Sequence, residues 1–477
     1  MKRHLLADHE ILKLHQAALR VLESTGMRIT HSPGRRLLQS AGCRVESGDI
    51  VRFPQEMVDE HLAMAPSTWT LYSRTGKEAL HLGGPQACFG PGTDLPYILD
   101  LHTSRRRTCR MDDVAQAALL ADGLEELDFV STQLCPANLP PHLVHVQSFK
   151  AVLEHSSKPV LFTAGSAREL EFMEEMASAA RGDASQGSKP FLIHFLEATS
   201  PLTLSVGMTK RLLFCASRGL PAALTSGPLR GAGAPLPLSG AVVQAHAEVL
   251  GAVALHQLKN PGAPVIAGFG VGTMNMATAE PLFATPEYTL AREASGRLFH
   301  LLGLPTWGAG GFADEHELDH EAAFQGVLSL LSFAPHGIDL IQNVASMGKG
   351  STGSPLFTVF IVEMLGYLKR FTQGLKLDHV EGDLQEIGEV GPGGSFLGTD
   401  RTFRLHGGEE AFSSPRRGGS VEECRQGSWG KWECARKRAL EIMEAHRPAP
   451  LPPHAREELR RILEEADRAL AGTGFEA

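Results

Sequence analysis

Cysteine is scarce in this sequence and is never spaced as metal or redox motifs require. The 477 residues contain seven cysteines, an odd number, and even Cys424 and Cys434, which lie near each other, are not separated by the two residues of a C-x-x-C motif. Zinc and iron–sulfur sites built on cysteine need clustered ligands. The sequence therefore excludes such sites and predicts reduced thiols.

Long apolar runs and an excess of positive charge are also missing. The run Phe191–Leu196 is interrupted by His194 and is far shorter than the roughly 20 residues that span a bilayer. Lys and Arg total 45 against 54 Asp and Glu, a net charge of −9, and only Arg105–Arg107 forms a basic run. The first residues lead into the amphipathic segment Ile11–Leu22 without the apolar stretch of a secretion signal. We expect no membrane, no nucleic-acid partner and a cytoplasmic location.

What the sequence does contain is the composition of a large globular protein. Hydrophobic residues make up 43% and charged residues 21%, which is sufficient for a packed core. Short β-rich runs alternate with longer segments of helical period, the pattern of a parallel sheet with crossover helices. Eight such runs predict an α/β fold, specifically a (β/α)8 TIM barrel. The predicted strands are Ala87–Gly90, Leu127–Gln133, Lys158–Ala164, Pro190–Glu197, Pro221–Ser226, Ala263–Gly268, Leu304–Ala309 and Ile338–Val344.

Composition divides the chain into three parts. Residues 1–85 are predicted to form an N-terminal cap of helices and short strands, and residues 86–374 the barrel. Residues 375–477 are predicted to form a C-terminal extension, with loops at Gly391–Gly394 and Ser413–Gly419 and helices at Trp429–His446 and His454–Ala471. In barrel enzymes the chemistry lies at the carboxyl ends of the strands, so candidate residues are sought there.

The stretch His316–His320 matches H-E-x-x-H, the zinc-hydrolase pattern. In that pattern two histidines on one helical face hold zinc and the glutamate activates water. A zinc-dependent hydrolase using His316 and His320 is therefore one alternative. The competing interpretation places Asp314, His316 and Asp319 in a loop and helix start beyond the seventh strand, with no metal and with Asp314 capping the helix.

The same residues nearly match D-x-H-x-x-G, the pattern by which corrinoid-carrying proteins supply a histidine to cobalt. Asp319 stands where that pattern has glycine. We therefore expect no tightly bound cofactor in this chain, so any corrinoid would arrive on another protein.

An ordered set of short segments resembles the trimethylamine methyltransferase superfamily. The similarity touches the N-terminal region at Val51–Pro54 and the C-terminal region at Gly391–Gly394, so it covers nearly the whole chain. Its central segments are Glu197–Leu202, His246–Glu248, Gln257–Pro264, Met274–Met276, Pro286–Glu287, Leu304–Pro305, Gly308–Gly310 and Asp314–Asp319.

This resemblance implies a (β/α)8 methyltransferase that moves a methyl group from an amine to the Co(I) of a separate corrinoid protein. The trimethylamine enzyme carries pyrrolysine in its active site, and this chain has no non-standard residue. The resemblance is therefore to the branch similar to glycine betaine methyltransferase. It implies a small quaternary amine substrate, most simply glycine betaine, and a corrinoid-binding partner. Large barrels of this kind often associate, so we also expect a homo-oligomer.

A quaternary nitrogen leaves as a neutral tertiary amine and needs no general acid, so the protein must orient the substrate rather than activate it. Trimethylammonium groups are held by aromatic faces and a nearby carboxylate. Aromatic candidates near strand ends are Phe89, Tyr97, Phe195, Phe269, Trp307 and Phe312. Candidate carboxylates are Asp94, Glu197 and Asp314, with Asp314, His316 and Glu197 taken as the catalytic set.

The carboxylate of a betaine would need a hydrogen-bond donor. Candidates are His194, His316, Gln342 and Asn343; His194 lies inside a strand, where a core histidine is the simpler interpretation, and Asn343 ends the eighth strand. A third alternative is a barrel that binds betaine without turning it over. The loop Met347–Gly350 is a candidate for closing over substrate or contacting the partner.

Overall fold

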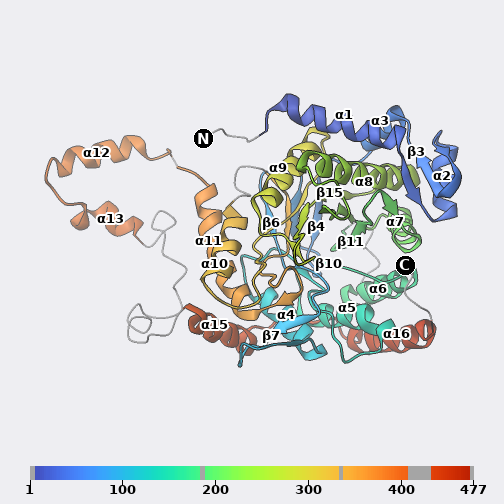
Figure 1. The fold of residues 1–477 in the computed structure, drawn as a ribbon. Coiled ribbons are helices and arrows are strands. Elements are labelled where there is room, and N and C mark those ends of the chain that lie inside the picture. The colour runs from blue at the N-terminus through green and yellow to red at the C-terminus, as the bar shows by residue number, and fades with distance from the viewer. Residues whose placement is uncertain (1–5, 183–188, 332–336, 376, 407–430, 473–477) are drawn as a thin grey trace.

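The protein has a mixed α/β fold in which eight strands each precede a helix (Figure 1). The structure, a computed structural model, describes residues 6–182, 189–331, 337–375, 377–406 and 431–472. Each of the eight strands overlaps one of the eight predicted segments, although β11 and β15 end one residue later than predicted. They are β6 (Cys88–Phe89), β9 (Val130–Ser131), β10 (Val160–Phe162), β11 (Leu192–Ala198), β13 (Ala222–Ser226), β15 (Val265–Phe269), β18 (Trp307–Ala309) and β19 (Leu340–Gln342).

The helices follow the strands in strict alternation. Several begin at a side-chain cap, such as Ser166 for α6 and Ser205 for α7, because a serine oxygen accepts a free backbone N–H of the first turn. The eight helices are α4 (Met111–Gly123), α5 (Val144–His155), α6 (Ala167–Arg181), α7 (Val206–Arg218), α8 (Leu238–Lys259), α9 (Pro286–Leu301), α10 (His320–Leu331) and α11 (Pro355–Thr372).

Parallel pairing joins these strands into two groups. One sheet has the order β15-β13-β11-β10-β9 and the other β18-β19-β6. The groups meet at both ends: Ala267 of β15 forms a parallel bridge with Thr306, and the amide of Asp128, before β9, donates to the carbonyl of Phe89 in β6. Each strand therefore has its sequence-order neighbour beside it, and all carboxyl ends lie at one edge.

Side chains alternate between two packed layers because successive strand residues point to opposite faces. Positions such as Leu161, Ile193, Ala223 and Ile266 form one buried cluster on the inner side of the strands. Positions such as Phe162, Leu192, Leu224 and Val265 pack with the helices in a second, larger cluster. This parity decides which residues near a strand end can share a site.

A hairpin from the N-terminal segment covers the amino edge of the strands. Hairpin β4 (Trp69–Tyr72) and β5 (Glu78–Leu82) lies there: the Trp69 indole donates to the carbonyl of Val265, and the Tyr72 amide donates to Pro190. The preceding elements are α1 (Asp8–Ser24), β1 (Met27–Ile29), α2 (Ser32–Ser40), β2 (Arg44–Val45), β3 (Ile50–Arg52) and α3 (Gln55–Leu62).

Asp339, at the start of the eighth strand, fastens this hairpin to the sheet. Its Oδ1 accepts from the amide of Gly83, and its Oδ2 accepts from the amide and the hydroxyl of Thr306. The side chain is 2% exposed. One carboxylate thus joins the hairpin, the seventh strand and the eighth strand.

Short strands extend the loops at the opposite, carboxyl edge. Strand β12 (Thr203–Leu204) pairs with β1, while β14 (Leu229–Arg230), β16 (Gly272–Met274) and β17 (Pro281–Leu282) form one small sheet. A second is formed by β20 (Thr352–Gly353), β7 (Tyr97–Leu99) and β8 (Arg106–Thr108). Lys349 pairs with Glu280 at 2.7 Å and so joins the loops that follow the sixth and eighth strands.

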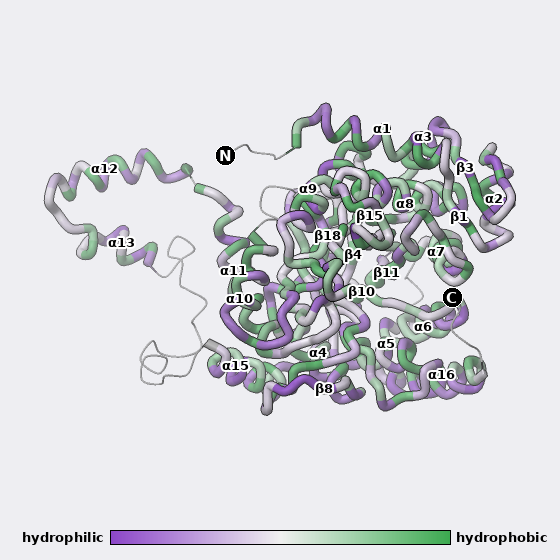
Figure 2. The backbone as a smooth tube through the Cα atoms, in the orientation of Figure 1, coloured by the Kyte–Doolittle hydropathy of each residue, from purple (hydrophilic) through white to green (hydrophobic). Residues whose placement is uncertain are grey.

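The C-terminal part contains both predicted helices, α15 (Lys431–Ala445) and α16 (Ala455–Leu470), which pack on the outside of the helical layer. Residues 413–419 and 429–430 of the predicted segments lie outside the described residues. Two helices were not predicted: α12 (Val380–Val390) and α13 (Asp400–Leu405) stand beyond α11, apart from the main body (Figure 1). Their hydropathy alternates along the tube in Figure 2.

Helix α8 is apolar and long enough to cross a membrane by length and composition, but 72% of its most apolar window is buried inside the protein. It packs against α1, α3 and the strands β13 and β15, so it serves here as a core helix. The interface with α1 contains two histidines, His15 and His246, whose Nδ1 and Nε2 atoms lie 3.1 Å apart.

We expect acid to weaken this α1–α8 interface. Burial lowers the pKa of both His15 and His246 because the charged imidazole loses its hydration. The unfolded chain then binds protons first, so stability present above about pH 6.5 is lost as the pH falls. Replacing His15 by Gln should flatten the decline of the unfolding free energy between about pH 7.5 and 5.5, measured by urea titration. Parallel pH profiles for the two proteins would contradict this.

Candidate functional site

The candidate site is built on the inner side of the strands at their carboxyl ends. In β11, Ile193 lies in the inner cluster with Phe195 against it, so Glu197, two residues further, points the same way. His194 and Leu196 point to the helices. Strand parity therefore brings Phe195 and Glu197 into one site.

Glu197 sits where a glycine leaves room for its carboxylate. A Cβ on Gly227, just after β13, would lie 3.0 Å from Glu197 Oε1. Glu197 is exposed, yet its pKa is raised to about 7. The larger cause is loss of hydration, and the smaller cause is repulsion from the nearby Glu248. Solvent therefore reaches the Glu197 carboxylate although protein atoms surround it.

Glu248, on α8, is the fixed negative charge behind this site. It is fully buried and accepts from the Ser226 hydroxyl, the Ser200 hydroxyl at 2.7 Å, the Leu202 amide at 2.8 Å and the Gln244 amide at 2.9 Å. Four donors satisfy the charge, so Glu248 is held in place and unavailable to a ligand.

Aromatic side chains gather in the same inner cluster. The rings of Phe195 and Trp307 have centroids 5.8 Å apart. Tyr288, from α9, makes edge contacts with Phe312 at 5.4 Å and with Phe283 at 6.0 Å. All five belong to one hydrophobic cluster, and the charge of Glu197 acts on Tyr288. Of the predicted aromatics, the structure thus brings together Phe195, Trp307 and Phe312.

Asp314 shapes the loop that carries Phe283. Its Oδ2 accepts from the amides of Phe283 at 2.9 Å and Ala284 at 2.8 Å, whereas its Oδ1 is buried and has no described partner. Burial raises the pKa of Asp314 against these hydrogen bonds. Asp314 therefore does not cap the following helix as predicted. Asp319 does so, accepting from the Ala322 amide at 2.8 Å.

The amides Gln342 and Asn343 lie at the end of β19. Gln342 Oε1 accepts from the Trp307 indole at 2.8 Å, which fixes the ring against the strand. Among the described hydrogen bonds none uses Gln342 Nε2. Asn343 has a left-handed backbone (φ 67°), and a Cβ on Gly92 would lie 2.4 Å from its Oδ1. The glycine therefore admits the amide of Asn343 at this edge.

Asp94 belongs to a group of charged side chains at the carboxyl edge, near the ends of β9 and β10. Its Oδ1 accepts from Thr163 at 2.8 Å and lies 4.0 Å from His145 Nε2, while His145 Nδ1 lies 3.1 Å from Glu169. Loss of hydration raises the pKa of Asp94 despite these partners. Burial opposes the charged imidazole of His145, but the hydrogen bond with Glu169 and the charge of Asp94 raise its pKa.

The structure places two predicted substrate contacts outside this site. His194 is fully buried on the helical side, with its Nδ1 3.1 Å from the Phe162 carbonyl, and burial lowers its pKa to about 3. Phe89 also packs outward, with the Lys369 ammonium 5.5 Å from its ring centre. The physical reason in each case is strand parity, and we do not retain these two residues.

Two further predicted aromatic residues also have other neighbours. Tyr97 lies under the Arg106 guanidinium, and Phe269 packs on Phe299 in the outer core.

The zinc-hydrolase alternative is contradicted by local geometry. Helix α10 begins only at His320, so His316 lies in the preceding loop and the two histidines do not share a helical face. Both side chains are exposed. Among the described residues, no group of three or more His, Cys, Asp or Glu is arranged to hold a metal ion. His316 instead lies against Gly348 in the loop after the eighth strand.

Several residues of the site escaped sequence reasoning. Tyr288 and Phe283 lie in and before α9, and His145 and Glu169 lie in first turns of α5 and α6. They lie far along the chain from Glu197 and Asp94, so no local sequence pattern connects them. The one usable signal was the βα alternation, because the first turn of each following helix returns to the same edge.

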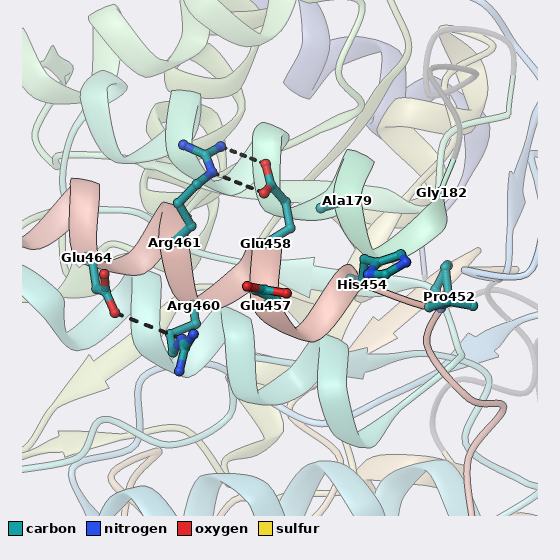
Figure 3. A pocket seen from close by; sticks show the side chains of 11 residues that line it. Ala179, Gly182, Pro452, His454, Glu457, Glu458, Arg460, Arg461 and Glu464 are labelled. Carbon is teal, nitrogen blue, oxygen red and sulfur yellow. Dashed lines mark hydrogen bonds and ion pairs between the residues drawn. The ribbon is translucent and has the colours of Figure 1, made fainter.

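A groove of about 530 Å³ lies elsewhere, between α6 and α16 (Figure 3). Its charged side chains pair with one another: Arg461 contacts Glu458, and Arg460 lies 4.0 Å from Glu464. It contains none of the candidate residues above, so we do not assign the site to it.

Comparison with known proteins gives a family match over nearly the whole chain. A family model described as trimethylamine methyltransferase (MTTB) matches residues 2–470. The trimethylamine methyltransferase MttB of Desulfitobacterium hafniense strain DCB-2 is 27% identical over 463 residues, covering 97% of this chain and 93% of the relative. The glycine betaine methyltransferase of Desulfitobacterium hafniense strain Y51 is 26% identical over 409 residues, with 85% of each chain covered.

Among solved structures, the monomethylamine methyltransferase MtmB of Methanosarcina barkeri aligns over 98% of this chain and 92% of its own, with a TM-score of 0.47 and 12% identity.

Proposed function

Because this chain belongs to the trimethylamine methyltransferase family, we propose that it transfers a methyl group from a small quaternary amine to the reduced cobalt of a separate corrinoid protein. Glycine betaine is the first substrate to test. The proposal includes closure of the eight strands into a (β/α)8 barrel, with one face of the molecule open to the acceptor protein. It also includes a cytoplasmic location, and no cofactor bound tightly by this chain itself.

The observation that carries this proposal is the aromatic cluster beside Glu197. Phe195, Trp307, Tyr288, Phe312 and Phe283 pack in one cluster, and the Glu197 carboxylate lies among the same strand ends. Each cation–π contact with a quaternary nitrogen contributes about 0.5–2 kcal/mol. The inward positions of the strands listed above carry no Lys or Arg. The buried Arg292 of α9 donates to the carbonyl of Ala309 at 2.9 Å, and its charge acts on Tyr288.

The chemistry asks little else of these side chains. The carbon–nitrogen bond breaks, its electron pair stays on the departing tertiary amine, and the methyl group passes to cobalt with no proton moved. The chain must hold the methyl carbon in line and exclude water from the reduced acceptor. Gln342 and Asn343 are the donors that we assign to a substrate carboxylate, and the Gln342–Trp307 hydrogen bond couples that end to the aromatic wall.

The corrinoid itself does not fit this chain as a resident group. His316, the histidine of the near match to the cobalt-ligand pattern, is exposed and lies against Gly348, and Asp319 is used as the cap of α10. This supports a corrinoid delivered by a partner.

The deciding experiment supplies free cob(I)alamin with purified protein and follows the absorbance change on methylation. We expect turnover with glycine betaine or another quaternary amine and none with trimethylamine. Absence of transfer from every quaternary amine tried would refute the methyltransferase proposal. Tight betaine binding by calorimetry in that case would identify a barrel that binds without catalysis.

The affinity for a quaternary amine should depend on pH through Glu197. Its pKa is about 7 in the free protein, and a cation favours the ionised carboxylate. The dissociation constant should therefore fall as the pH rises through about 7, by up to tenfold per unit below the pKa, and level off above it. Calorimetric titrations between about pH 5.5 and 8.5 measure this. A pH-independent constant would exclude Glu197 as the contact to the cation.

A further inference from the structure

The helices α12 and α13 form an arm that leaves its apolar side chains in solvent. We define the arm as residues 377–406. Neither helix buries any side chain. Along α12, Val380, Leu384 and Ile387 follow helical spacing on one face and are 41%, 58% and 56% exposed. Further exposed apolar residues of the arm are Leu377, Phe396, Leu397, Phe403 and Leu405.

The arm nevertheless has a defined internal shape. Arg401 of α13 pairs with Asp383 of α12 and lies 3.6 Å from Glu386 of the same helix. Gly382 leaves space for that guanidinium, because a Cβ there would lie 2.4 Å from it. A helical hairpin is thus held together by charge, while no other part of the described chain covers its apolar face.

Such an arm is not expected to persist alone in water. Helix α12 has 11 residues and α13 has 6, and isolated helices below about 12–15 residues are marginal. Helices of this length are stabilised mainly by burying an apolar face. The arm therefore requires a surface to cover it.

A matching apolar patch lies on the body at the root of the arm. On α10, Phe324, Leu328 and Leu331 follow helical spacing and are 64%, 51% and 40% exposed. On the neighbouring α11, Tyr367 and Phe371 are 55% and 64% exposed. We call these five residues the body patch. In Figure 1 the arm extends away from α10 and α11 of its own chain rather than folding back over them.

We infer that the arm of one copy of this chain docks on the body patch of a second copy, giving a two-fold dimer with exchanged arms. One chain carries both halves of the contact, so two identical chains complete it twice. An aromatic side chain buries on the order of 150 Å². The partly exposed apolar residues of the two contacts are therefore sufficient for an interface of about 1,000–2,000 Å². That is the area a stable dimer needs.

The position of the arm favours a second copy over the corrinoid protein. Helix α11 ends beside the amino edge of the strands, where Lys369 donates to the carbonyl of Glu126 and contacts Asp128, just before β9. Glu197 and the aromatic cluster lie at the carboxyl edge. An acceptor protein bound to the arm would therefore be at the wrong end of the barrel.

The test uses the full chain and measures molar mass by light scattering after size exclusion. Leu384→Glu with Ile387→Glu alters the arm, Phe371→Glu with Leu328→Glu alters the body patch, and Leu12→Glu on α1, 47% exposed, is the matched control. We expect a dimer for the unaltered chain and the control, and a halved mass for each double variant with an unchanged circular dichroism spectrum. An unaltered chain that stays monomeric, or a dimer that survives both double variants, would overturn the inference.

A mixing experiment separates arm exchange from other dimers. An arm variant and a body-patch variant, mixed in equal amounts, can still form one intact contact between the normal arm of one and the normal patch of the other. Dimers should therefore return in the mixture although neither variant dimerises alone. Failure of the mixture to associate, with both variants folded, would exclude exchange. No substrate is involved, so the outcome is independent of the proposed function.

Discussion

Glu197→Gln should raise the KM for the quaternary amine by about tenfold to a hundredfold while changing kcat by less than about threefold. The variant keeps the shape of the side chain but removes the charge that attracts the trimethylammonium group. The positive charge disappears as the methyl group leaves, so an ionised carboxylate stabilises the bound amine more than the transition state. The loss should therefore appear in binding.

The same variant has two further readouts. Its dissociation constant should no longer vary with pH around 7, because the group whose pKa is raised is gone. Glu171→Gln, on the outer face of α6, removes a surface carboxylate and serves as the control. If Glu197→Gln lowered kcat and left KM unchanged, Glu197 would act in the chemical step and not in binding the cation.

Asp339→Ala should lower the unfolding free energy by about 3–5 kcal/mol. The substitution leaves the amides of Gly83 and Thr306 and the Thr306 hydroxyl without their buried acceptor. Each of these donors lost its water on folding, so each carries a desolvation penalty once the carboxylate is absent. Urea unfolding followed by circular dichroism measures the change.

Two comparisons keep the Asp339 prediction decisive if the alanine variant does not fold. Asp339→Asn retains one acceptor oxygen and should lose less stability than Asp339→Ala. Asp59→Ala, on the exposed side of α3, should change stability by no more than about 0.5 kcal/mol. Equal effects of Asp339→Ala and Asp59→Ala would show that the carboxylate does not fasten the hairpin.

The strands were predictable because each is a short apolar β-rich run followed by a helical segment, and that alternation survives in the sequence without any tertiary information. The site was only partly predictable, since position near a strand end does not reveal which side of the sheet a residue faces. His194 and Glu197 lie in one strand three residues apart and face opposite layers. Phe89 was predicted to contact the substrate, but its neighbour Cys88 occupies the inner position and Phe89 faces the helices.

Contacts between residues far apart in the sequence could not be predicted, for a different reason. Asp94 and His145 come together only when the first turn of α5 returns to the carboxyl edge, and Tyr288 reaches Phe312 across two loops. The H-E-x-x-H match failed because the chain starts its helix at Asp319, which caps α10, four residues too late for the pattern. Helix α12 was missed because Gly382 and Gly388 weaken its helical signal.

In the proposed barrel, the β4–β5 hairpin would block entry from the amino edge. Trp69, Tyr72 and Gly83 fasten the hairpin across the amino edge, so amine, methyl acceptor and demethylated product would all use the carboxyl edge. Under the proposed function, a shared route would impose an order of binding. The amine would enter before the corrinoid protein binds, and the tertiary amine would leave only after that protein dissociates. An excess of acceptor would then block its own supply of methyl groups.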